Sequence, residues 1–152
     1  MRLHSVIVRN HRDGNKVSRG SALAALLGAL VACAEPAPPC PFTGTPDTAP
    51  SAGCFATSDE GLLMVQGLNG KISLPGGSSE PGESAQCTAF RETWEETGLR
   101  LQPGELLRVF STGFHLYRCD GTSTSGTHRA PTPEVRAAFY LGVDQFGSYD
   151  WR

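Results

Sequence analysis

Short apolar runs separated by turn residues predict β-strands in the first part of the folded region. Residues 54–57 and 62–66 flank the sequence SDEG, which predicts a hairpin with its turn at residues 59–61. An Asn-Gly turn at residues 69–70 precedes a short predicted strand at residues 72–74. The folded region is therefore expected to begin with β-structure.

One stretch predicts an α-helix. Residues 83–97 contain neither Gly nor Pro, and most of them are good or neutral helix formers. Gly98 follows at the position of a C-cap glycine. The preceding residues 75–82 are rich in glycine and proline, so we expect a loop that leads into this helix.

Two further strands are predicted after the helix. A turn at Pro103-Gly104 precedes an apolar run at residues 106–110, and we expect this strand to continue through residues 114–117. Residues 135–143 form the last predicted strand, around the apolar centre AFYL. The polar residues 119–132, broken by Gly and Pro, predict a loop between the two strands.

Composition indicates one ordinary globular domain. The chain has 152 residues, of which 39% are hydrophobic and 18% charged, with a formal net charge of −2. The domain has no stripe of Lys and Arg, which argues against binding of a nucleic acid polymer through its phosphate backbone.

The N-terminus is typical of an export signal. Residues 1–20 carry five Lys or Arg and one acid, and the uncharged run at residues 21–32 has the length of a signal-peptide core. This run is too short for a stable transmembrane anchor. We expect an exported protein, periplasmic or lipid-anchored; it would be cytoplasmic if this interpretation is wrong.

Three interpretations of this segment remain open. The sequence LVAC resembles a bacterial lipobox, which would lipidate Cys33 and tether the protein to a membrane. The sequence Ala-Cys-Ala instead fits ordinary signal-peptidase cleavage after Ala34. A helix of the domain itself is the third alternative. The predicted organisation is a signal at residues 1–34, a Pro-rich linker at residues 35–52 and a domain at residues 53–152.

The cysteines lack the spacing of a structural zinc site. Without Cys33, four remain, an even number suited to two disulfides in an oxidising compartment, with three pairings open. A bond between Cys87 and Cys119 would brace the predicted helix. Four reduced thiols in a cytosolic enzyme are the alternative. The five cysteines are Cys33, Cys40, Cys54, Cys87 and Cys119.

Three glutamates share one face of the predicted helix. Glu92, Glu95 and Glu96 have the spacing i, i+3 and i+4, which places their Cβ atoms about 5–6 Å apart. Their charges repel, and Arg91 alone does not neutralise them. A hard divalent cation would, and Mg²⁺ is usually held by one or two carboxylates together with substrate phosphates. A solvated acidic surface is the alternative for the glutamates alone.

Residues 77–99 resemble the signature of the Nudix family. That signature is Gly, five residues, Glu, seven residues, Arg-Glu, two residues, Glu-Glu, one residue, Gly and an apolar residue. Thr93 occupies a position where the pattern prefers an aliphatic residue, a change that affects packing. The matching positions are Gly77, Glu83, Arg91, Glu92, Glu95, Glu96, Gly98 and Leu99.

The resemblance implies an α/β (α+β) fold of the Nudix type, an α/β/α sandwich with a mixed sheet and the catalytic loop and helix. The C-terminal helix of that fold is not visible in the sequence. Residues 86–99 and the scattered cysteines also resemble, more weakly, exported Nudix modules that precede a membrane phosphatase domain of the phosphatidic-acid-phosphatase type.

The resemblance further implies hydrolysis of a small-molecule diphosphate with Mg²⁺, or alternatively Mn²⁺. The substrate would be a nucleoside diphosphate derivative or a lipid or isoprenoid diphosphate. Glu95 and Glu96 match metal ligands, and Glu92 matches a residue that binds metal or acts as a base. A backbone carbonyl at Gly77 would add a ligand. A catalytically silent Nudix-fold binding or regulatory module is the alternative.

Two residues of the signature, Glu83 and Arg91, match a pair that ties the loop to the helix. Glu134 is the candidate for a further acid that acts as base or ligand, and a solvated surface carboxylate is the alternative there. The remaining histidines and aromatic residues receive no role, and the aromatic residues are expected in the core. They are His115, His128, Phe110, Phe114 and Tyr117.

Overall fold

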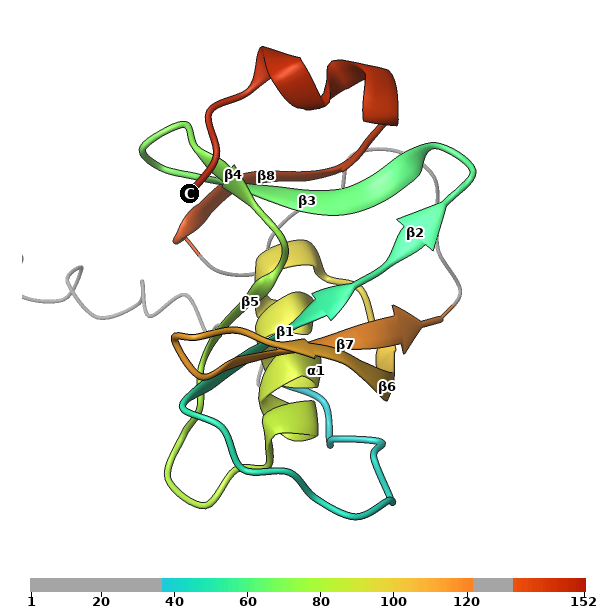
Figure 1. Cartoon of the computed structure of the whole chain (residues 1–152), viewed down its shortest axis with the longest axis vertical. Coiled ribbons are helices and arrows are strands. Elements are labelled where there is room, and N and C mark those ends of the chain that lie inside the picture. The colour runs from blue at the N-terminus through green and yellow to red at the C-terminus, as the bar shows by residue number, and fades with distance from the viewer. Residues whose placement is uncertain (1–36, 122–132) are drawn as a thin grey trace, which may run out of the picture. The chain divides into compact units, whose positions relative to one another are not determined.

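The computed structural model describes residues 37–121 and 133–152, and these form an α+β fold with two four-stranded sheets and one α-helix (Figure 1). In the first sheet the strand order is β5-β1-β7-β6. The second sheet has the order β2-β3-β4, with β8 paired to the other side of β3. A short 3₁₀-helix, η1, follows β8.

The bounds of the elements of the first sheet are β1 (Ser51–Phe55), β5 (Gly76–Ser78), β6 (Gln102–Val109) and β7 (Phe114–Asp120). Those of the second sheet are β2 (Thr57–Ser58), β3 (Gly61–Gly67), β4 (Ile72–Ser73) and β8 (Val135–Leu141). The helices are α1 (Ala85–Thr97) and η1 (Val143–Ser148).

The first sheet is mixed, because β1 pairs parallel with β7 and antiparallel with β5. Helix α1 packs on this sheet, and the shared core joins small side chains of the helix to β1 and β7 (Figure 1). The mixed sheet and the single main helix confirm the predicted fold class. Within residues 37–121 and 133–152, no helix is long and apolar enough to cross a membrane.

Helix α1 begins and ends where the sequence predicted to within two residues. The Ser84 side chain caps its first turn by accepting a hydrogen bond from the Cys87 N–H at 3.3 Å. At the other end, Gly98 adopts a left-handed conformation and its N–H donates to the Trp94 carbonyl at 2.7 Å. These caps fix which face of the helix meets the sheet.

Two strand predictions were wrong. Residues 106–117 form two antiparallel strands, β6 and β7, because Gly113 takes a positive φ of 82° and closes a turn. Pro103 and Gly104 lie inside β6 instead of in a turn. Proline is tolerated there because β6 is the edge strand of its sheet.

The first hairpin was also misplaced. The strands that flank the predicted turn are β2 and β3, whereas residues 54–55 belong to β1 in the other sheet. The glycine-rich segment expected to be a loop contains strand β5, in which Gly76 and Gly77 pair with β1. An added Cβ at Gly76 would lie 2.6 Å from the Ala52 carbonyl oxygen, so this pairing requires glycine.

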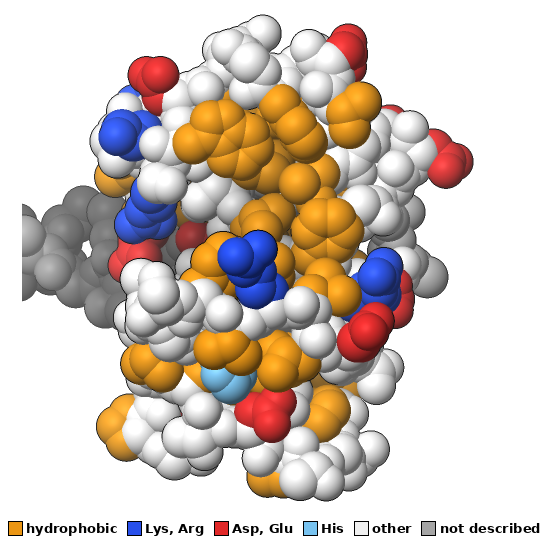
Figure 2. Space-filling model, in the orientation of Figure 1, with side chains coloured by type: hydrophobic (Ala, Val, Ile, Leu, Met, Phe, Trp, Pro, Cys, Tyr) orange, Lys and Arg blue, Asp and Glu red, His pale blue; other side chains and the backbone are white. Residues whose placement is uncertain are grey.

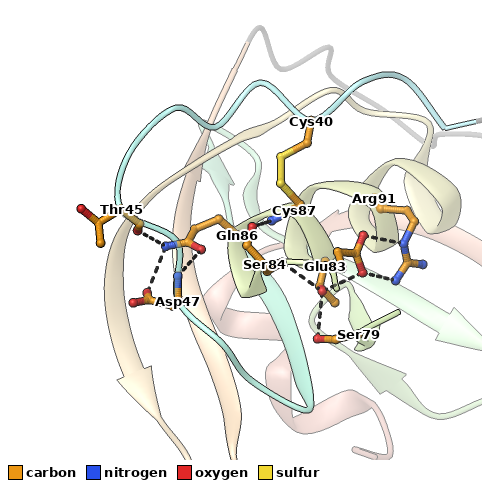
Figure 3. The surroundings of a disulfide bond; sticks show 10 residues. Cys40, Thr45, Asp47, Ser79, Glu83, Ser84, Gln86, Cys87 and Arg91 are labelled. Carbon is orange, nitrogen blue, oxygen red and sulfur yellow. Dashed lines mark hydrogen bonds and ion pairs between the residues drawn. A yellow bond between two sulfur atoms is a disulfide. The ribbon is translucent and has the colours of Figure 1, made fainter. Parts of the chain in front are cut away.

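The four described cysteines form two disulfides, Cys40–Cys87 (Figure 3) and Cys54–Cys119. The number of bonds agrees with the prediction, but the suggested Cys87–Cys119 pair was wrong. Cys54 and Cys119 lie in adjacent strands and are buried under α1. Cys87 lies at the start of α1, where the preceding chain brings Cys40 to it.

Residues 37–50 contain no helix or strand, yet they lie against α1. The Asp47 carbonyl accepts a hydrogen bond from the Ala85 N–H at 2.8 Å, and the Asp47 N–H donates to Gln86 Oε1 at 3.0 Å. The Tyr117 hydroxyl donates to Asp47 Oδ2 at 2.7 Å. The range predicted as a linker is thus bonded to the helix, and its last two residues lie in β1. The predictions for residues 1–34, Cys33 included, and for His128 fall outside the described residues.

The Thr93 hydroxyl is the polar atom that the packing leaves unsatisfied. Its side chain is fully buried, and Oγ1 has no hydrogen-bond partner within the described part of the chain. Burial of an unpaired hydroxyl costs about 1–3 kcal/mol. The aliphatic residue that the signature prefers at this position would avoid that cost.

We expect T93V to raise the free energy of unfolding by about 1 kcal/mol or more, measured by urea denaturation. The matched control is T88V, at a threonine that is equally buried but has its Oγ1 2.8 Å from Glu83 Oε2 and 2.9 Å from Ser79 Oγ. T88V should lower stability. Equal destabilisation by both substitutions would contradict the assignment.

Candidate functional site

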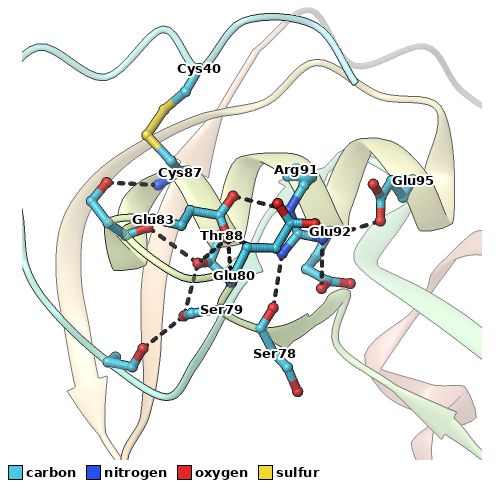
Figure 4. A network of polar contacts seen from close by, with 12 residues as sticks. Cys40, Ser78, Ser79, Glu80, Glu83, Cys87, Thr88, Arg91, Glu92 and Glu95 are labelled. Carbon is cyan, nitrogen blue, oxygen red and sulfur yellow. Dashed lines mark hydrogen bonds and ion pairs between the residues drawn. A yellow bond between two sulfur atoms is a disulfide. The ribbon is translucent and has the colours of Figure 1, made fainter. Parts of the chain in front are cut away.

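The guanidinium group of Arg91 joins the helix to the segment that precedes it (Figure 4). Its Nε and Nη2 atoms each lie 3.0 Å from an oxygen of Glu83, a two-point contact that fixes the plane of the guanidinium. Nη2 also donates to the Ser78 carbonyl of β5 at 2.8 Å. One side chain therefore holds β5, the following turn and α1 together.

Arg91 also contacts the acidic face of the helix. Its Nη1 atom lies 2.9 Å from Glu92 Oε1 and 3.2 Å from Glu95 Oε2. Only 14% of the Arg91 side chain is exposed. Hydrogen bonding to Glu83 and the charges of Glu92 and Glu83 raise its pKa, against the opposing effect of burial. The guanidinium is permanently charged here.

The sequence-predicted pair Glu83 and Arg91 is in contact, and Glu83 has further donors. The Glu80 N–H donates to Glu83 Oε2 at 3.0 Å, and the Thr88 hydroxyl lies 2.8 Å from the same oxygen. Burial opposes the charge of Glu83, but the Arg91, Glu80 and Thr88 hydrogen bonds outweigh it and lower the pKa. Glu83 is therefore an ionised structural anchor.

Glu92 lies against the backbone of β5. An added Cβ at Gly77 would lie 2.5 Å from the Glu92 carboxylate, so a larger residue there would displace this carboxylate from its position. Burial raises the pKa of Glu92, Arg91 opposes this shift, and the charges of Glu95 and Glu134 add to it. The close approach explains why the signature begins with a glycine at this position.

Glu96 is the most perturbed carboxylate of the site. Its Oε2 atom accepts a hydrogen bond of 2.8 Å from the Gly76 N–H, which positions the side chain at the end of β4 and β5. Burial raises its pKa to about 7, the Gly76 bond opposes this, and the charges of Glu92 and Glu134 raise it further. A carboxylate held in this way favours a nearby positive charge.

A cavity of about 340 Å³ lies beside Glu96. Glu134, at the start of β8, lines it together with Glu96, although the two residues are far apart in the sequence. Arg152 also lines it, and its charge opposes the raised pKa of Glu96. The structure thus brings Glu134 to the same cavity as Glu96.

The chemistry of these donors fits a hard divalent cation, because carboxylate oxygens and a backbone carbonyl are the ligands that Mg²⁺ prefers. Glu92, Glu95, Glu96 and the backbone of Gly77 could supply them. In the described residues, however, no three Asp, Glu, His or Cys side chains converge as in a formed metal site. Arg91 holds Glu92 and Glu95 instead.

Sequence reasoning assigned no role to Asn69 or Arg152. The Asn-Gly pair was used only to predict a turn, but Asn69 lines the cavity beside Glu96. Gly76 was identifiable as a backbone position next to the signature, whereas nothing in the sequence marks Arg152.

His115 belongs to a network with Tyr117 and Asp47. Its Nδ1 atom is 3.3 Å from the Tyr117 hydroxyl, which donates to Asp47. Tyr117 is buried in the core, as expected. Burial and the neighbouring Asp47 raise the pKa of Tyr117, so its hydroxyl stays protonated.

Comparison with known proteins identifies this arrangement. A family model described as NUDIX domain matches residues 47–150. A MutT-like protein of Streptomyces ambofaciens is 40% identical over 100 residues, which is 62% of this chain and 63% of that protein. A mouse protein, nucleoside diphosphate-linked moiety X motif 6, is 41% identical over 58 residues, 36% of this chain and 18% of that protein. The chain thus spans less than two thirds of either relative.

Solved structures share the fold. A NUDIX hydrolase from Nitrosomonas europaea superposes with a TM-score of 0.56 at 21% identity, over 65% of this chain and 75% of that chain. An ADP-ribose pyrophosphatase from Streptococcus suis superposes with a TM-score of 0.52 at 21% identity, over 66% of this chain and 77% of that chain. At this identity the likeness concerns the fold alone.

Removal of the Arg91 guanidinium should unfold the site. We expect R91A to lower the free energy of unfolding by about 3–5 kcal/mol, because Glu83, Glu92 and Glu95 would lose their shared counter-charge. R91K should recover only part of the lost free energy of unfolding, because an ammonium group keeps the charge but cannot make the two-point contact with Glu83. The control is R118A, at an exposed residue 3.6 Å from Glu105, which should change stability by less than about 1 kcal/mol. Equal effects at both positions would contradict this account.

Glu96 should make stability depend on pH. Its pKa is raised from the ordinary 4.5 to about 7, so the folded state binds its proton more tightly than the unfolded chain. Stability should therefore fall as the pH rises through this interval, by about 2–4 kcal/mol in total. E96Q should remove this decline in metal-free urea denaturation, becoming more stable than the wild type at neutral pH. If the free energies of unfolding of the wild type and of E96Q changed with pH in parallel, Glu96 would not be the group responsible for the decline.

Proposed function

The chain belongs to the Nudix family, and from this premise we propose that it hydrolyses a diphosphate linkage with the help of Mg²⁺, or alternatively Mn²⁺. The observation that carries the proposal is the acidic face of α1 against the glycine backbone of β5. Glu92, Glu95 and Glu96 lie on that face, and Glu96 lines a cavity that Glu134 also lines. These oxygen donors are of the kind that binds Mg²⁺ together with substrate phosphates.

The proposed cation ligands are Glu92, Glu95 and Glu96, with the backbone carbonyl of Gly77. When bound, the cation would stabilise charge on the phosphate oxygens and lower the pKa of a water molecule. Arg91 contacts one oxygen each of Glu92 and Glu95, so the cation would bind the other oxygens or compete with Arg91 for these carboxylates. The hydrogen bond from Gly76 already orients Glu96.

The other residues of the site have separate proposed roles. Glu83 and Arg91 position the helix against β5, and they act through the carboxylates that Arg91 contacts. Glu134 is the proposed general base, because it lines the cavity and is exposed enough to exchange a proton with solvent. Arg152 is suited to binding a phosphate oxygen.

We propose that the protein works outside the cytoplasm. The disulfides Cys40–Cys87 and Cys54–Cys119 favour an oxidising compartment. Residues 1–34 would then serve as a signal peptide, or Cys33 as a lipid anchor. The substrate class remains a small-molecule diphosphate, either a nucleoside diphosphate derivative or a lipid or isoprenoid diphosphate.

A second candidate is a catalytically silent binding or regulatory module. The observation that favours it is the pair of contacts by which Arg91 occupies the carboxylates of Glu92 and Glu95. A module of this kind would bind a diphosphate without turning it over. Activity measurements separate the two candidates.

We expect phosphate release from a panel of nucleoside and isoprenoid diphosphates in the presence of Mg²⁺, and none after chelation. E95Q should lower kcat/KM by at least about 100-fold, because it removes a proposed ligand of the cation. The matched control is E105Q, at a glutamate exposed on β6 away from the cavity, which should retain activity. A folded wild-type protein that binds Mg²⁺ but releases no phosphate would support the silent module instead.

A further inference from the structure

A second and larger hollow, which we call the apolar groove, lies between the two sheets. It has a volume of about 680 Å³, within the range of about 300–1,000 Å³ typical of small-molecule sites. Its walls come from the segment after β4, the turn between β6 and β7, and the residues after η1. The side chains that matter below are Leu74, Phe110, Phe114 and Trp151.

The apolar groove meets the candidate site at Arg152 and Gly76. Arg152 lines both the groove and the cavity beside Glu96. Gly76 and Gly77 also line the groove, and Gly76 is the residue whose N–H holds Glu96. The Phe114 ring lies over glycine backbone, because an added Cβ at Gly53 or Gly76 would lie 2.6 or 3.1 Å from its Cζ atom. A diphosphate held by Arg152 would therefore have its ester group next to the groove.

Aromatic side chains leave apolar surface open to solvent here. Phe110 is 40% exposed and Trp151 44% exposed, so the prediction that Phe110 is a core residue was wrong. Figure 2 shows hydrophobic side chains gathered over the middle of this face, with a Lys or Arg side chain among them. Arg108 lies over the Phe110 ring, with its Cζ atom 5.1 Å from the ring centroid. Exposed apolar surface of this kind next to a polar site is a common mark of ligand binding.

The lining favours an aliphatic chain over a nucleobase. Arg152 is the one charged side chain among the described residues that line the apolar groove, and none of them is an acid or an amide. Apart from the Arg152 guanidinium and backbone groups, the polar partners for the edge of a base there are hydroxyl groups. The rings of Phe110 and Phe114 meet edge to face, at 6.0 Å and 70°, so they form no parallel slot for a flat base.

We propose that the apolar groove binds the hydrocarbon part of the substrate, and that the preferred substrates are diphosphate esters of hydrophobic alcohols. The inference rests on the proposed hydrolase function and names its substrate class. In the reaction, the oxygen of water bonds to one phosphorus and the bridging P–O bond breaks. The products are the alkyl monophosphate, which keeps its chain in the groove, and inorganic phosphate.

The test is a homologous series of ethyl, butyl, hexyl, octyl and geranyl diphosphates, with ADP and UDP for comparison, in Mg²⁺. Each added carbon that becomes buried should raise kcat/KM by about fourfold until the groove is full. F110S should lower the value for the octyl ester by about tenfold or more and leave the ethyl ester nearly unchanged. V109S, at an exposed neighbour that does not line the groove, is the matched control.

Calorimetry with ethyl and octyl monophosphate provides a readout that does not need turnover. Octyl phosphate should bind with the more negative heat-capacity change, and F110S should reduce that difference. If kcat/KM does not depend on chain length, or ADP and UDP are preferred, the inference is wrong while the hydrolase function stands. If no diphosphate is hydrolysed, the proposed function is wrong, and the calorimetry alone then decides whether the groove binds hydrocarbon.

Discussion

The ion pairs of Arg91 are the interaction on which the site depends. The guanidinium is nearly buried and contacts Glu83, Glu92, Glu95 and the Ser78 carbonyl at once. Because it links strand, turn and helix, it sets the distance between the acidic face of α1 and the backbone of β5. It also neutralises two of the carboxylates that a cation would need, so loop geometry and metal affinity are coupled through one side chain.

Glycine provides the second constraint, because β5 lies close to both strand β1 and helix α1. Gly76 lies against the backbone of β1 while its N–H reaches Glu96, and Gly77 leaves room for the Glu92 carboxylate. A side chain at either position would separate the sheet from the helix. The strand is therefore both a structural edge and part of the wall of the site.

The helix, its C-terminal cap Gly98 and its acidic face could be predicted from sequence because they depend on contacts within about four residues. The disulfide pairing could not, because Cys54 meets Cys119 only through the parallel pairing of β1 and β7. Glu134 was found as a candidate, but its position beside Glu96 follows from β8 pairing with β3. The split of residues 106–117 into two strands was missed because a single glycine reverses the chain.

The Cys40–Cys87 bond has a mechanical consequence. It joins the chain ahead of the domain to the first turn of the helix that carries Arg91 and the three glutamates. Tension applied N-terminal to Cys40, as from an attachment to a surface, would pass through the two sulfur atoms into α1. The ten residues after Cys40 and strand β1 would carry little of that load. Helix α1, rather than the edge of a sheet, would then be the point at which the domain is held.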